Sequence, residues 1–249
     1  MTEKLPTKLK KEPLIDALFE MRFTSATPAS SILPGVLFSK LAANTTIEQL
    51  PAAQLPKALL DSEPNLRFAP LVRIHWDKFL VLISDRSLAV GCQMPYPGWG
   101  AFKPAILEVV KVLKDVGIVQ AVHRFSMKYI DLIPAGSLAE QIASINGTVV
   151  LGNHTLKQEV FTLRMEIPKD GMLHAVQITS SAVATLQDGS NKEGVIVDID
   201  TISELNNPDF GYWIGQLSGK LDSLHQANKA MFFECLRPEA IAALEPVYE

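Results

Sequence analysis

Charged residues alternate with apolar residues in five short segments of this chain, and this alternation constrains the fold more than any other feature of the sequence. The segments are residues 19–23, 72–76, 123–129, 163–167 and 197–200. Because successive side chains on a β-strand point to opposite faces, each segment predicts a strand with one apolar and one charged face. The predicted helices are too few and too far apart for a doubly wound parallel sheet. The sequence therefore predicts an α+β fold with largely antiparallel sheet.

Turn residues and helical periodicity divide the chain into two halves of similar plan. A β-meander over residues 66–94 precedes a helix over 102–116, and a second meander over 158–201 precedes a helix over 210–236. Short links between the strands of each meander imply antiparallel neighbours. Each half is thus expected to be a meander followed by a long helix.

The boundaries of these halves follow from proline residues and from changes in composition along the sequence. The lysine-rich residues 1–12 are expected to form a flexible tail, and Pro13 marks the start of order. The N-terminal α+β half covers residues 13–134, and the C-terminal α+β half covers residues 135–249. The two halves are expected to pack as one unit.

Composition narrows the class of protein. A net charge of -4 and a pI near 5.8 argue against bulk binding of nucleic acid, although a local basic strip stays open. No apolar run approaches the ~18 residues that span a bilayer, and the N-terminus lacks the apolar stretch of a secretory signal. We therefore expect a cytoplasmic protein that does not contact the membrane. The two cysteines, Cys92 and Cys235, provide no disulfide framework.

Common catalytic signatures do not occur in the sequence. There is no phosphate-wrapping GxxxxGK[ST] loop, no GxGxxG after a strand, no HExxH zinc pair and no GxSxG elbow. Common nucleotide-binding and hydrolase folds are therefore disfavoured, and no residue is assigned a catalytic role.

Acidic residues on the predicted strands suggest a metal site. Asp198 and Asp200 are two residues apart on one strand, so both carboxylates point to the same side, where a divalent cation could bridge them. Glu20 and Glu166 could complete a Mg²⁺ or Mn²⁺ site if their strands are neighbours. The alternative is that these acids form ion pairs with basic residues across the strands or face water.

Basic residues on the same strands suggest a phosphate-bearing ligand, because guanidinium groups match phosphate oxygens in a bidentate manner. The candidate ligand residues are Arg22, Arg73, His75, Arg124, Lys128 and Arg164. If the sheet curls, they could converge, and together with the acids they would suit triphosphate hydrolysis or nucleotide sensing. The alternative is a half-solvated antiparallel sheet with no ligand, which shows the same pattern.

The C-terminal helix carries more aromatic bulk than one helix face usually needs. Trp213 and Phe232 lie on its predicted apolar stripe, and Phe233 adds to the aromatic bulk. These side chains either fill the core of the chain or form a subunit interface.

Four stretches of the chain resemble a sporadically distributed family of uncharacterised bacterial proteins of about this length. They are residues 12–23, 128–133, 197–200 and 224–234. In that family the first stretch reads like PPI-x-EA-x-FEIRF and the second like RYIN-x-I, so Lys128 and Asp131 replace the usual arginine and asparagine. The resemblance transfers no activity and no catalytic residue. The patchy occurrence of the family is similar to that of genes in antiviral defence islands, which implies a sensor or a partner in a complex.

Two functions therefore stand as expectations. The first is a non-enzymatic cytoplasmic binding or assembly protein without a cofactor, either a homo-oligomer or the partner of a protein encoded by a neighbouring gene, in defence against phage. The alternative is metal-dependent binding or hydrolysis of a phosphate or nucleotide on the charged face of the sheet. Convergence of the charged side chains in a concavity would favour the second.

Overall fold

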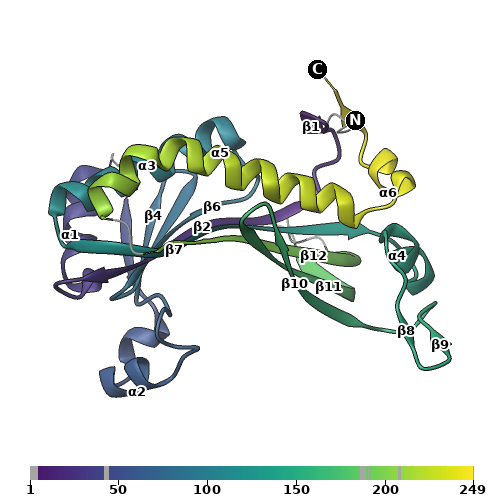
Figure 1. Cartoon of the computed structure of the whole chain (residues 1–249), viewed down its shortest axis with the longest axis horizontal. Helices are drawn as coiled ribbons and strands as arrows, with labels where there is room; N and C mark the ends of the chain where they lie inside the picture. The colour runs from purple at the N-terminus through teal and green to yellow at the C-terminus, as the bar shows by residue number, and fades with distance from the viewer. Residues whose placement is uncertain (1–4, 42–44, 186–188, 190, 207–208, 249) are drawn as a thin grey trace. The chain divides into compact units, whose positions relative to one another are not determined.

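The computed structural model (Figure 1) describes residues 5–41, 45–185, 189, 191–206 and 209–248. Its strands form a large antiparallel sheet of nine strands, accompanied by helices, and this confirms the predicted α+β class. The order across the sheet is β10 (Thr162–Lys169), β11 (Met172–Thr185), β12 (Asn191–Glu204), β7 (Val119–Pro134), β2 (Leu14–Ser25), β6 (Ser87–Cys92), β5 (Phe79–Ile83), β4 (Val72–Trp76) and β3 (Thr46–Gln49). The strands β10 and β3 are therefore its two edges.

The chain divides into two compact units that do not follow the predicted halves. Unit 1 comprises Met1–Asp16, Lys128–Thr201 and His225–Glu249, and unit 2 comprises Ala17–Met127 and Ile202–Leu224. The long elements β2, β7, β12 and α5 (Phe210–Cys235) each contribute residues to both units. The predicted halves were consecutive stretches of sequence, so they could not include elements that belong to both units.

The core of unit 1 lies between strand residues and the C-terminal helices. Alternate residues of β11 and β12 are buried, as the period of two in their sequences predicts. They pack with the last turns of α5 and with α6 (Pro238–Ala243). The core members from these elements and from the link between α5 and α6 are Val176, Ile178, Val195, Val197, Ile199, Met231, Phe232, Phe233, Leu236 and Ala240.

The first residues of unit 1 correct the expectation of a flexible tail. From residue 5 the structure describes this segment, and β1 (Lys8–Leu9) pairs antiparallel with β13 (Pro246–Val247). Leu9 is buried in the core of unit 1, and Leu5 packs against it. The apolar residues between the lysines therefore fix the segment, while residues 1–4 lie outside the described part of the chain.

The remaining elements of unit 1 are short. Helix α4 (Leu138–Ser144) begins with a capping box, in which the hydroxyl of Ser137 accepts from the backbone of Glu140 and the Glu140 carboxylate accepts from the backbone of Ser137. The strands β8 (Val150–Leu151) and β9 (His154–Thr155) form a separate two-stranded sheet.

Unit 2 is built on the first predicted meander. The strands β4, β5 and β6 pair in sequence order, and β6 also pairs with β2. Helix α1 (Ala29–Lys40) contacts α3 (Trp99–Val116), β4 and β5, and α3 contacts β6. Gly117 closes α3 in the left-handed conformation, with φ of 73°, as its position in the sequence predicts.

The segment between α1 and β4 differs most from the prediction. The meander expected from residue 66 begins only at Val72, and a short edge strand, β3, pairs with β4. The 3₁₀ turn η1 (Pro51–Gln54) and helix α2 (Lys57–Ser62) precede a loop that contains Phe68. The prolines and polar residues of this stretch gave no period from which β3 could be predicted.

Candidate functional site

The acidic residues predicted to bind metal form ion pairs with basic neighbours. The Oδ2 atom of Asp198 lies 2.9 Å from Nζ of Lys128 in unit 1. Glu166 lies 3.1 Å from Arg164, two residues away on β10. Glu20 of unit 2 lies 3.0 Å from Arg22, two residues away on β2.

Opposite charges thus pair, but only Lys128 with Asp198 joins two strands as the alternative described, and the other two pairs each lie within one strand. Asp200 lies half-buried on β12, on the same face as Asp198. Within the described ranges, no group of three or more histidine, cysteine, aspartate or glutamate side chains is placed to hold a metal ion.

The basic residues predicted to bind a ligand are distributed between the two units. Arg73 and His75 on β4 both reach Oε2 of Glu48 on β3, at 3.3 Å each. Sequence reasoning missed Glu48, because it missed β3. Arg22 and Arg124 belong to unit 2, whereas Lys128 and Arg164 belong to unit 1.

The three aromatic residues considered for a subunit interface are buried inside their units. Trp213 is 1 % exposed and packs against the rings of Phe125 and Phe210 in unit 2. Phe232 and Phe233 belong to the core of unit 1. These side chains therefore fill the core of the chain, the first of the two uses that the sequence offered, and not a subunit interface.

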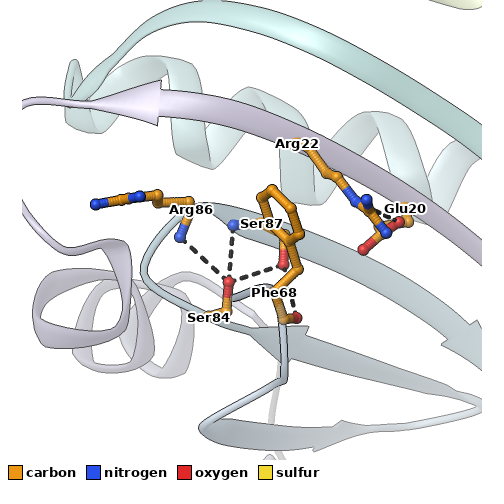
Figure 2. A network of polar contacts seen from close by, with 6 residues as sticks. All are labelled: Glu20, Arg22, Phe68, Ser84, Arg86 and Ser87. Carbon is orange, nitrogen blue, oxygen red and sulfur yellow. Dashed lines mark hydrogen bonds and ion pairs between the residues drawn. The ribbon is translucent and has the colours of Figure 1, made fainter. Parts of the chain in front are cut away.

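Figure 2 shows how the polar face of unit 2 is covered beside Arg22. The guanidinium of Arg22 lies over the ring of Phe68, 4.2 Å from its centroid, while its Nε donates to Glu20. The hydroxyl of Ser87 donates to the backbone carbonyl of Phe68 at 3.3 Å and lies 2.8 Å from that of Ser84. The stacked cation and the Ser87 hydrogen bond thus both hold the loop that carries Phe68 against the sheet.

We expect a measurable coupling between Arg22 and Phe68. A double-mutant cycle with Arg22→Met and Phe68→Leu should give a coupling free energy of about 0.5–1 kcal/mol, because a half-exposed cation over an aromatic ring contributes that much. Urea denaturation of the four proteins measures it. Additive effects of the two substitutions would show that the stacked contact does not stabilise the loop.

A row of polar residues interrupts the apolar interior of unit 1. Tyr129 and Asp131 are alternate residues of β7, and both are buried. The hydroxyl of Tyr129 lies 3.0 Å from Nδ1 of His225 on α5. Burial raises the pKa of the Asp131 carboxyl well above its usual range, and the carboxylate of Glu12 raises it further.

Glu12 and Lys229 belong to the same group of charges. Glu12 keeps an exposed side, yet the loss of water around its carboxyl raises its pKa, against the opposite influence of Lys8 and Lys229. Burial lowers the pKa of Lys229, and Glu12 opposes that shift. The group binds protons more tightly at its acids and more weakly at its base than free side chains do. Sequence reasoning noted Asp131 only as a departure from a family pattern.

The edge strand β10 presents a surface of a different kind in unit 1. It pairs with β11 over its whole length, from Thr162 opposite Thr179 to Lys169 opposite Met172. None of its residues is buried, and the side chain of Met165 is 42 % exposed. A strand of this length with one unpaired edge can accept a further strand through its backbone groups. It is the candidate binding surface of the chain.

Comparison with known proteins adds no family to this description: no protein-family model matches the chain, and no curated protein is similar to it in sequence. Among the helices that the structure describes, none has the length and apolar character needed to cross a lipid bilayer.

Proposed function

We propose that this chain is a non-enzymatic binding or assembly protein of the cytoplasm. It works either as a homo-oligomer or with a protein encoded by a neighbouring gene. The observation that carries this proposal is the exposed edge of β10, where, among the residues that the structure describes, a whole strand of unit 1 is paired on one side only and Met165 is exposed. A strand edge of this kind binds partners through main-chain hydrogen bonds.

The ion pairs support the same proposal. The predicted ligand residues Arg73, Lys128 and Arg164 each have an acidic partner within the chain. These pairs give the charged faces a structural role that needs no phosphate. The resemblance to a patchily distributed bacterial family extends the proposal to a sensor or complex component in defence against phage.

Light scattering on the purified protein tests the proposal. We expect a molar mass at least twice the 27.3 kDa of one chain, or a stable complex when the neighbour-encoded protein is co-expressed. A strict monomer over a wide range of concentrations that binds no such partner would contradict it.

A further inference from the structure

We propose that β10 pairs antiparallel with β10 of a second copy of this chain, about a twofold axis that passes through Met165. This inference rests on the proposed assembly function and names its partner and its register. Three features of β10 carry it: the direction of its backbone groups, the order of its charges and the apolar row on its other face.

The backbone direction is fixed by the pairing with β11. The amide of Ser180 donates to the carbonyl of Phe161 at 3.0 Å, directly before the register of Thr162 with Thr179. In an antiparallel pair, residues that exchange these bonds alternate with residues whose amide and carbonyl point the other way. The register of β10 is unbroken, so Arg164 and Glu166 direct their backbone groups outward.

The charges select one register for a second β10. With Met165 opposite Met165 of the second copy, each Arg164 lies opposite a Glu166, and both residues have outward backbone groups that can bond. A shift of the pairing to the next permitted register places two Arg164 residues opposite each other, or two Glu166 residues. Like charges directly opposite destabilise a strand pair, so only the register centred on Met165 is complementary to itself.

The other face of β10 supplies the apolar contact. Leu163, Met165 and Ile167 lie opposite Ile178, Val176 and His174 of β11, all of which are buried. The apolar row of β10 thus continues the buried face of unit 1 and stops at the sheet edge. In the proposed pair, Leu163 meets Ile167 of the second copy, and the two Met165 side chains meet at the axis.

Pro168 fits this arrangement. It falls on the outward-bonding side of the strand, where its missing amide breaks no bond to β11. In the proposed register it lies opposite Thr162 of the second copy, at the end of the pair. The pairing is thereby confined to the middle of β10.

Oxidative cross-linking of Met165→Cys tests the register. Residues opposite each other in a non-hydrogen-bonded pair have Cα atoms about 4.5 Å apart, which a disulfide can bridge. We expect the variant to form a covalent dimer at least roughly tenfold faster than Leu151→Cys, a control at an 82 % exposed position of the same unit. The native thiols interfere little, because Cys92 is buried and burial raises the pKa of Cys235 to about 11.

A charge-swap series tests the contact without a covalent bond. Arg164→Glu and Glu166→Arg should each raise the dissociation constant of the dimer by roughly tenfold. In either variant, residues 164 and 166 of facing strands carry the same charge, and the twofold axis produces this repulsive pair two times. The double variant Arg164→Glu/Glu166→Arg should restore wild-type affinity. Sedimentation velocity measures the affinities, and thermal unfolding confirms that all variants are folded.

The results separate this inference from the proposed function. The β10 pairing is overturned if the single charge substitutions leave the dissociation constant of the dimer unchanged. It is also overturned if Met165→Cys forms the disulfide-linked dimer no faster than Leu151→Cys. Either result leaves the proposed assembly function intact. If the protein is a monomer that binds the neighbour-encoded protein, the pairing with a second copy is excluded and the proposed assembly function is retained. A monomer that binds no such partner overturns both proposals.

Discussion

Gly194→Ala should lower the free energy of unfolding by on the order of 3 kcal/mol, the upper end of the range for overpacking a folded interior. In β12 of unit 1, a Cβ atom at this position would lie 2.1 Å from the carbonyl oxygen of Ile133 and 3.1 Å from Cα of Pro134. Both are backbone atoms, so no rotamer change relieves the clash, and the strand must move. For a chain of this size, the loss should lower the midpoint temperature of thermal unfolding by on the order of 10 °C.

A matched substitution separates the clash from the general effect of replacing glycine. Gly219 lies exposed within α5, and a Cβ there would meet nothing within 4 Å. Gly219→Ala should therefore stabilise the protein by about 0.5–1 kcal/mol, because glycine loses more backbone freedom than alanine in a helix. Equal unfolding midpoints for Gly194→Ala and wild type would show that the close approach at Gly194 is not a constraint.

The alternation of apolar and polar residues was sufficient to predict the strands that bury one face. In β4 and β5 alternate residues are buried, and the apolar stripe of α3 lies inside as its spacing predicts. The edge strand β3 was missed because all four of its residues are exposed, so no alternation marks it. Leu9 likewise gave no signal, because a single buried residue among lysines has no period.

The candidate sites were predicted less well, for a physical reason. The sequence offered ion pairs across the strands, whereas Arg164 pairs with Glu166, and Arg22 with Glu20, two residues away on the same strand. Partners across strands depend on register, which turn residues alone did not fix, so Lys128 with Asp198 was one of several options. The unpaired edge of β10 follows from the order of the strands in the sheet, which no local pattern contains.

Asp131→Asn should stabilise the protein at neutral pH and have little effect in acid. In the unfolded chain an aspartate loses its proton near pH 4. In the folded chain, burial and Glu12 keep the pKa of Asp131 well above its usual range. Between these two pKa values the folded state binds more protons than the unfolded state. The free energy of unfolding of the wild type therefore falls as the pH rises from the unfolded pKa through the folded pKa.

Asparagine carries no proton to lose, so this part of the pH dependence should disappear in the variant. The gain over wild type should be near zero below about pH 4 and should grow to a plateau above the folded pKa of Asp131, by about 1.4 kcal/mol for each unit of pKa shift. Urea denaturation at a series of pH values measures it. The control is Asp115→Asn at an exposed position of α3, which shows how much of the gain any aspartate-to-asparagine substitution produces.

The carboxylate of Glu12 provides an internal check on this explanation. Glu12→Gln removes the negative charge that contributes to the raised pKa of Asp131. In that background Asp131→Asn should gain less stability at neutral pH, because less of the shift remains to be relieved. An equal gain in both backgrounds would assign the whole shift to burial, and a loss of stability at neutral pH would show that the Asp131 carboxylate has a favourable partner in the folded chain.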